Sequence, residues 1–275
     1  MSITSTSRRF DHLSWPEAAE AVGLEGSTLA WPFGACEQHG PHLPLMTDAF
    51  FAERMLVEVL ERLPADLPIW MLPAQPLGFS PEHEAFPGTL SLSANLMFQL
   101  VIEVGQQLAA MGARRLLLFN AHGGQIGLLH VAARQLRAQC PGMAVLPCFL
   151  WSGVEALKDL LPKSECEVGL HAGLAETSLM MSMAPELVGL DRPIDGDHST
   201  PGQLTTPPMG WSLEGHAPCA WLTDDFSESG VIGDSREANA ELGHALEQAL
   251  ADHWVNLLIS LMGSQWPPVR DPARL

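Results

Sequence analysis

The segment Trp31-Pro-Phe-Gly-Ala-Cys-Glu-Gln-His-Gly-Pro-His-Leu-Pro-Leu-Met-Thr-Asp48 brings ligand-type side chains close together in the chain: Glu37, His39, His42 and Asp48. Residues 27–33, which precede it, predict a short buried strand that breaks at Pro32 and Gly34. The residues after Asp48 predict a helix. These polar groups are therefore expected on the loop that leaves the carboxyl end of a strand, where open α/β folds bind ligands.

The spacing within this loop favours a metal site. Glu37 and His39 are two residues apart, so an extended backbone places both side chains on one face. Pro41 and Pro44 restrict the backbone between them and Asp48. Carboxylates combined with imidazoles suit zinc, manganese or iron better than a set of thiolates alone would.

Predicted strands and helices alternate along the rest of the chain. Apolar runs predict strands at 69–73, 114–120 and 142–149, and helical spacing of apolar residues predicts helices at 50–63, 96–111, 125–138 and 235–262. Residues 188–229 are rich in Pro, Gly, Thr and Asp, which favours loops and an irregular hairpin. The alternation predicts an α/β fold with a doubly wound, mostly parallel sheet, in one domain spanning 1–275.

Composition narrows the classes of partner and compartment. The formal net charge of −18 disfavours nucleic acids and anionic membranes, because phosphate groups bind to basic patches. The N-terminal residues lack the apolar run of a signal peptide, and no stretch reaches the roughly 18 apolar residues of a membrane span. Five cysteines without a CxxC spacing argue against a disulfide framework and a thiolate zinc site. We expect a cytoplasmic protein.

Two further segments carry the same residue types. The predicted strand at 114–120 ends in Asn120-Ala-His122-Gly-Gly, and His171 lies five residues before Glu176 at the start of another predicted helix. Because parallel strands bring their carboxyl ends together, we expect these groups to converge with the first segment. Three carboxylates with two or three imidazoles suit two divalent ions that share one bridging carboxylate and activate a water. The reaction expected is hydrolysis of an amide or related C–N bond.

These segments resemble the creatininase family of metal-dependent amidohydrolases. The resemblance rests on Glu37-Gln-His-Gly-Pro-His-Leu-Pro-Leu-Met-Thr-Asp48, on the His122 turn, on His171-Ala-Gly-Leu-Ala-Glu176-Thr-Ser, on 86–92 and on Gly230-Val-Ile-Gly-Asp before a helix. It covers roughly residues 10–260. It implies a three-layer αβα fold, a dinuclear site that commonly holds zinc or manganese, with iron as a further option, and a ring-like homo-oligomer, often a hexamer.

The resemblance also assigns roles. The residues that match metal ligands are Glu37, His39, Asp48 and His122, with Asp48 as the bridge. Creatininase has a ligand glutamate where this chain has Gly124, and Glu176 is the natural replacement. His171 matches the histidine that donates a proton to the leaving nitrogen, and Glu176 is assigned to the catalytic centre with it. The candidates for substrate binding are Ser80, His83, Gly123 and Trp151.

The family pattern leaves the substrate open. Creatininases carry a tryptophan shortly before the proton-donating histidine, where this chain has Cys166-Glu-Val-Gly, so creatinine is not the expected substrate. A small-molecule amide or formamide is the first expectation, and trimming of a short peptide in cofactor maturation is the alternative. A hypothesis from a different class of function is a non-catalytic assembly module that metal ions stabilise. A metal-dependent phosphatase or nuclease is disfavoured by the negative charge and by the lack of a Gly-rich phosphate loop with lysine.

Overall fold

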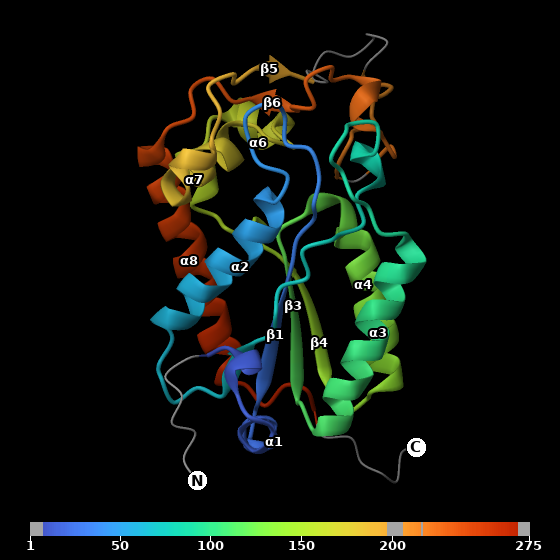
Figure 1. Ribbon diagram of the computed structural model, residues 1–275, viewed down its shortest axis with the longest axis vertical. Helices are drawn as coiled ribbons and strands as arrows, with labels where there is room; N and C mark the ends of the chain where they lie inside the picture. Colours follow the sequence, from blue (N-terminus) through green and yellow to red (C-terminus); the bar gives the residue numbers. More distant parts are fainter. Residues whose placement is uncertain (1–7, 197–205, 216, 269–275) are drawn as a thin grey trace.

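A parallel four-stranded sheet forms the centre of the molecule (Figure 1). The computed structural model describes residues 8–196, 206–215 and 217–268. The strands lie in the order β2-β1-β3-β4, and all of them run in the same direction. Their bounds are Thr28–Phe33 (β1), Ile69–Met71 (β2), Arg115–Asn120 (β3) and Ala144–Phe149 (β4). The parallel α/β sheet predicted from the sequence is thus confirmed.

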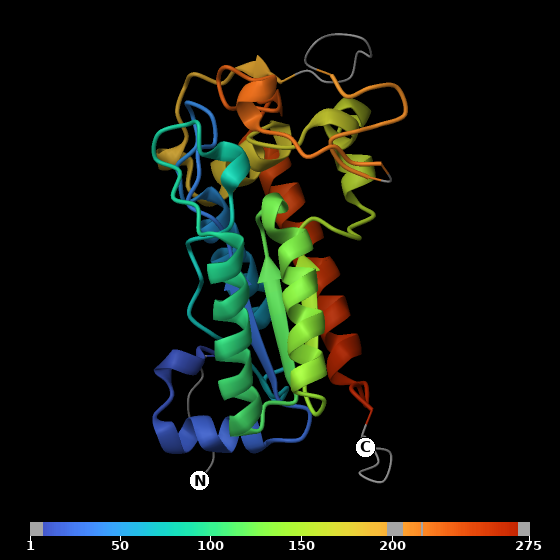
Figure 2. The ribbon, with the colours of Figure 1, turned by 90° about the vertical axis from the view of Figure 1, so that its right-hand side faces the viewer.

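Helices cover both faces of the sheet (Figures 1 and 2). One layer holds α2 (Thr47–Arg62), α7 (Leu174–Met183) and α8 (Ala240–Met262), and the other holds α3 (Ala94–Met111) and α4 (Ile126–Gln139). Helix α1 (Trp15–Gly23) crosses the lower end of the sheet. The shorter helices are α5 (Leu157–Leu160), α6 (Lys163–Val168) and five 3-10 turns: η1 (Phe10–His12), η2 (Pro81–His83), η3 (Gly123–Gln125), η4 (Pro185–Leu187) and η5 (Thr223–Asp225).

Alternating side chains of the two central strands explain the three layers. In β3, Leu116 and Leu118 pack with the α3/α4 layer, while Leu117 and Phe119 pack with the α2/α7/α8 layer. Successive side chains of a strand point to opposite faces, so a continuous apolar run builds two cores at once. All residues of β1, β2 and β3 are buried.

The first strand does not break at Pro32, as the sequence had suggested, but continues to Phe33. The carbonyl oxygens of Ala30 and Pro32 accept hydrogen bonds from Leu72 and Gln75, so these residues face the β2 side. Because β2 ends at Met71, Pro32 needs no N–H on that side, and the parallel ladder to β3 is undisturbed. The strand ends at Gly34, as expected.

The structure also differs from the sequence prediction at the starts of two helices and in the expected hairpin. Helix α2 begins at Thr47, which places Asp48 inside its first turn rather than before it. Helix α8 begins at Ala240 rather than 235, because the Asn239 side chain accepts a hydrogen bond from the Leu242 N–H and caps the helix there. Among the described residues of 188–229 no hairpin forms. Instead β5 (Ile194–Asp195) pairs antiparallel with β6 (Gly233–Asp234), beyond that range. No helix in the described parts of the chain has the length and hydropathy needed to cross a membrane.

Candidate metal centre and active site

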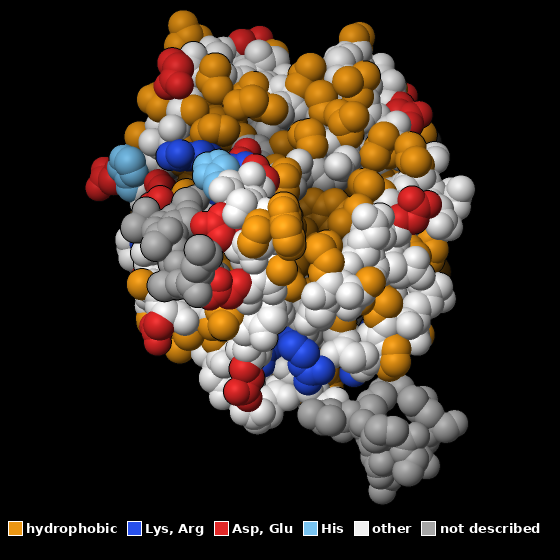
Figure 3. All heavy atoms as spheres, turned by 60° about the horizontal axis from the view of Figure 1, so that its bottom comes forward, with side chains coloured by type: hydrophobic (Ala, Val, Ile, Leu, Met, Phe, Trp, Pro, Cys, Tyr) orange, Lys and Arg blue, Asp and Glu red, His pale blue; other side chains and the backbone are white. Residues whose placement is uncertain are grey.

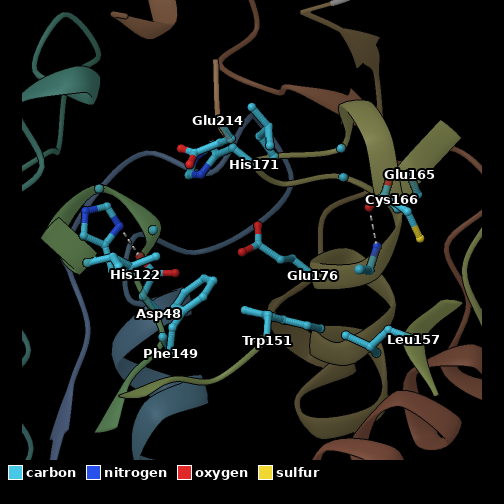
Figure 4. A pocket seen from close by; sticks show the side chains of 18 of the residues that line it. Asp48, His122, Phe149, Trp151, Leu157, Glu165, Cys166, His171, Glu176 and Glu214 are labelled. Atoms are coloured by element: carbon cyan, nitrogen blue, oxygen red, sulfur yellow. Dashed lines mark hydrogen bonds and ion pairs between the residues drawn. The ribbon is translucent and has the colours of Figure 1, made fainter. Parts of the chain in front are cut away.

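The three segments singled out in the sequence meet above the carboxyl ends of the strands (Figure 4). The first leaves β1 and enters α2, where the backbone of Gly34 approaches so closely that a Cβ there would lie 2.2 Å from the Ala49 nitrogen. This contact sets the first turn of α2 against the end of β1. The second segment leaves β3 at Asn120, whose side-chain oxygen accepts a hydrogen bond from the His122 backbone N–H. The third enters α7 through His171, whose backbone pairs with Ile232.

Glu37 lies at the centre of the cluster and is almost completely buried. Its Oε2 lies 3.2 Å from His122 Nδ1 and accepts a hydrogen bond from the Ser80 hydroxyl. Its Oε1 lies 3.5 Å from His83 Nε2 and 3.8 Å from His171 Nδ1. The carboxylate is therefore surrounded by imidazole rings from three different segments.

The two oxygens of Asp48 face different histidines. Oδ1 lies 3.4 Å from His39 Nε2, and Oδ2 lies 3.3 Å from His122 Nδ1. His39 Nδ1 lies 3.2 Å from the Glu37 carbonyl oxygen and donates its hydrogen there, so Nε2 is the nitrogen that would exchange its proton for a cation. A carboxylate between two ring nitrogens in this way has the geometry of a bridge between two cations.

Glu176 and His171 form the other side of the cluster. The Glu176 carboxylate accepts a hydrogen bond of 2.7 Å from the Ala172 N–H, and in Figure 4 it points into the space between His171, Asp48 and Trp151. Ala172 has a φ of 51°, a left-handed conformation that costs energy for a residue with a Cβ. One atom each of His39, His171 and Glu176 lie within 4.8 Å of one another.

Burial and neighbouring charges pull the pKa values of these groups apart. Burial, reinforced by Asp48 and opposed by His122, raises the pKa of Glu37 to about 7. Burial would lower the pKa of His39, but Asp48, Glu176 and Glu37 together raise it to about 9. Burial, together with His83 and His39, holds the pKa of His171 well below its usual value. Without metal ions, the cluster thus contains an excess of buried carboxylates, and their negative charge attracts cations.

The donor set fits divalent metal ions. Three buried side-chain atoms in the cluster have no hydrogen-bond partner in the structure: Glu37 Oε1, His39 Nε2 and Asp48 Oδ2. Unpartnered polar atoms in a protein interior are costly, and bound cations are one way to satisfy them. Carboxylate and imidazole donors in this proportion suit zinc and manganese.

A cavity of about 450 Å³ opens over the cluster. Its wall includes Glu37, Asp48, His122, His171 and Glu176 on one side. The rest of the wall includes apolar residues, namely Phe149, Trp151, Leu157, Leu161, Leu170 and Trp221, together with charged residues such as Lys158 and Glu214. The buried donors are therefore accessible to a ligand that fills this cavity.

The structure brings all of the predicted metal-ligating residues together: Glu37, His39, Asp48, His122 and Glu176. Of the predicted substrate-binding residues, His83, Gly123 and Trp151 line the cavity. Ser80 instead lies behind Glu37, is fully buried and holds that carboxylate by a hydrogen bond. His42 Nε2 and the Thr177 hydroxyl share a hydrogen bond of 2.8 Å, which connects the loop to α7.

Sequence reasoning misses several residues of this site: Gln38, Glu82, Glu165, Glu214 and Trp221. Gln38 lies between two ligands in the chain, and its carbonyl oxygen accepts a hydrogen bond of 2.7 Å from His171 Nε2. Burial raises the pKa of Glu165 to about 7, and its carboxylate accepts a hydrogen bond from the Ala175 N–H in the first turn of α7. The sequence signal for Glu82 is its position next to His83, in a loop that already carries a candidate residue.

Comparisons with known proteins identify relatives of this chain. The sequence profile of creatininase, described as creatinine amidohydrolase, matches residues 11–258. The mycofactocin precursor peptide peptidase of Mycobacterium tuberculosis is 34% identical over an alignment of 258 residues, which covers 89% of this chain and 87% of that protein. The creatinine amidohydrolase of Pseudomonas putida is 31% identical over an alignment of 202 residues, which covers 68% of this chain and 76% of the other.

Solved structures show the same fold. A creatininase described with manganese has a TM-score of 0.74 at 24% identity, and the superposition covers 95% of this chain and 100% of the other. A mutant creatininase described as Zn-Zn type has a TM-score of 0.74 at 25% identity, covering 96% and 100%. The extent of the sequence match and the shared fold establish that this chain belongs to the creatininase family of hydrolases.

Proposed function

We propose that the protein hydrolyses the C–N bond of an amide in a short peptide, at a pair of divalent metal ions. The observation that carries this proposal is the cavity of about 450 Å³, which is lined by both the buried cluster and apolar side chains. Cavities of roughly 300–1,000 Å³ accommodate ligands of drug size, which suits one or two residues of a peptide. The likeness to a peptide peptidase over 89% of the chain supports this substrate class.

Two sets of residues would hold the ions. His122 faces one oxygen of Asp48 and also Glu37, while His39 faces the other oxygen of Asp48 and lies near Glu176. Zinc or manganese bound there would act as a Lewis acid on the carbonyl group. It would also lower the pKa of a water molecule, which would then be a nucleophile near neutral pH. Asp48 would keep the two ions at a fixed separation.

His171 is placed to move the proton. Its Nε2 donates to the Gln38 carbonyl oxygen, so its Nδ1 faces the cluster without a proton. This nitrogen can take a proton from the attacking water and deliver it to the leaving nitrogen, which cannot depart as an amide anion. Because burial lowers the pKa of His171, a ring that has taken up a proton gives it up readily.

The test is a turnover screen of the purified protein with Zn²⁺, Mn²⁺ or Fe²⁺. The substrates are short peptides with apolar terminal residues, creatinine, formamides and lactams, with products identified by mass spectrometry. We expect cleavage of peptides that stops with a chelator and returns with metal. Turnover of small amides without peptide cleavage would show that the substrate class is wrong. Two bound ions without any turnover would favour the assembly-module reading.

A small cyclic amide is the second candidate substrate. The indole rings of Trp151 and Trp221 both line the cavity and offer flat apolar surfaces to a planar ring. One of the relatives is named creatinine amidohydrolase, and creatinine is a small cyclic molecule of this kind. The same screen separates the two candidates.

We also propose a homo-oligomer, as the resemblance implies, with a hexamer as the expected size. Several large apolar side chains are exposed, among them Trp15, Val131, Leu190 and Met209. Figure 3 shows hydrophobic side chains spread over the face that it turns towards the viewer, with few Lys or Arg between them. Apolar surface of this kind is typical of subunit contacts. Light scattering coupled to size-exclusion chromatography would give the mass, and a monomer would contradict the proposal.

A further inference from the structure

The ring of His122 has a second carboxylate beside its other nitrogen, within the same cluster. Glu82, on η2, is 9% exposed, and its Oε1 lies 3.4 Å from His122 Nε2. The Phe79 carbonyl oxygen lies 3.0 Å from the same nitrogen. Both neighbours accept hydrogen bonds, so His122 Nε2 carries the hydrogen. Nδ1 is the nitrogen that faces Glu37 and Asp48 and would bind a metal ion there.

Gly124 provides the space for this carboxylate. A Cβ at this position would lie 1.7 Å from Glu82 Oε1 and 2.7 Å from His122 Nε2. No side chain at 124 is therefore compatible with Glu82 in its place. By contrast Glu84, two residues along the same loop, is exposed to solvent.

We propose that Glu82 is a positioning residue, which holds the His122 ring in the tautomer that binds metal and strengthens Nδ1 as a ligand. A histidine ligand that donates its other N–H to a carboxylate is fixed in orientation and becomes more basic. The Phe79 carbonyl alone would fix the tautomer, but only Glu82 adds a negative charge. This inference rests on the proposed metal-dependent function.

The first test is a zinc titration of metal-free protein against a chromophoric chelator. Glu82→Gln keeps the shape of the side chain but removes its charge, and Glu84→Gln is the matched control on the exposed position. We expect one of the two zinc sites to weaken about 10- to 100-fold in Glu82→Gln, with the other unchanged. The control should bind like the parent protein. Equal affinities in all three proteins would overturn the inference.

The outcomes separate the two proposals. If the parent protein binds no zinc, the proposed metal-dependent function fails. If zinc binding is unchanged in Glu82→Gln but KM rises, Glu82 contacts substrate and the positioning role is wrong. Proton–nitrogen NMR spectra of the zinc-bound proteins provide a readout independent of activity. The Nε2–H proton of His122 should be shifted downfield by its carboxylate acceptor in the parent and in Glu84→Gln, and less so in Glu82→Gln.

A second pair of variants approaches the same carboxylate from its other side. Gly124→Ala must displace Glu82 and the tip of His122, so it should weaken zinc binding at least as much as Glu82→Gln does. Gly127→Ala is its control, because a Cβ at 127 meets nothing within 4 Å. If Glu82→Gln does not fold, Glu82→Asp replaces it, since the shorter side chain keeps the charge but withdraws it from His122. Full zinc affinity in Gly124→Ala would contradict the inference.

Discussion

Asp48 connects the two halves of the cluster through a single side chain. It enters the site in the first turn of α2, and its two oxygens lie 3.4 Å from His39 and 3.3 Å from His122. The surrounding histidines outweigh the effect of burial and hold the pKa of Asp48 well below its usual range, so the side chain is a carboxylate at neutral pH. Both oxygens are therefore available to cations.

We predict that Asp48→Asn loses both metal ions, because an amide presents only one oxygen and no charge. Metal content after dialysis against metal-free buffer, measured by atomic emission, tests this. Glu61→Gln is the control, since Glu61 is an exposed carboxylate on the same helix. Two ions retained in Asp48→Asn would show that Asp48 is not the bridge.

For His171 we predict the opposite pattern. His171→Asn should retain both ions but lower kcat about 10²- to 10⁴-fold, the range typical of a lost general acid–base group. His244→Asn, at an exposed position on α8, is the control and should keep the parent rate. Loss of one ion in His171→Asn would instead identify His171 as a ligand.

At the scale of elements, the contact of α7 with α8 sets the position of Glu176. The two helices approach so closely that a Cβ on Gly243 would lie 1.9 Å from the Ser178 carbonyl oxygen. Glu176 is two residues before Ser178 on α7, so a shift of this helix would move its carboxylate. The buried core on this side, including Leu179, Leu246 and Leu250, keeps the two helices together.

Gly243→Ala should therefore lower the free energy of unfolding by about 1–3 kcal/mol, the usual cost of overpacking, despite the better helix propensity of alanine. Gly127→Ala, on α4, introduces the same group into open space and should leave stability unchanged or raise it by up to about 1 kcal/mol. Urea unfolding of both variants measures the difference. Equal stabilities would show that the α7–α8 contact adapts without cost.

For the molecule as a whole, metal binding and stability are linked. The sheet and its two cores hold the ligands at one end of the fold, where the excess of buried carboxylates opposes folding until cations neutralise it. Ions that bind only the folded chain add stability, by about 2.7 kcal/mol at a concentration 100 times the Kd. A chelator should therefore lower the melting temperature.

The pH dependence of stability should reverse when metal is removed. In the metal-free protein the pKa of His39 is raised to about 9, so the folded state holds this proton more tightly than the unfolded state. The resulting stabilisation is complete below the unfolded pKa of roughly 6.5 and is lost as pH rises through 9. With metal bound, protons compete with cations for the imidazoles, so stability should rise with pH over the same range.

Thermal unfolding between pH 7 and 9.5, with chelator or with saturating Zn²⁺, measures both slopes. The range excludes the titration of His83 and His171, whose pKa values are lowered in the folded protein. Despite burial, Glu37 and Asp48 raise the pKa of His122, so His122 adds to the slope in the same direction as His39. Parallel slopes in the two conditions would show that neither histidine exchanges a proton for a metal ion.

The sequence by itself determined the parallel α/β fold, because continuous apolar runs such as residues 116–119 of β3 make both faces of a strand apolar and require helices on each side. It also determined which residue types end those strands, and hence that Glu37, His39, Asp48 and His122 meet at one edge of the sheet. Only the tertiary structure decided which way those side chains face and what supports them. Ser80 behind Glu37, and Glu82 behind His122, come from a loop without periodicity. Their places depend on packing between distant segments, and local sequence carries no trace of such contacts.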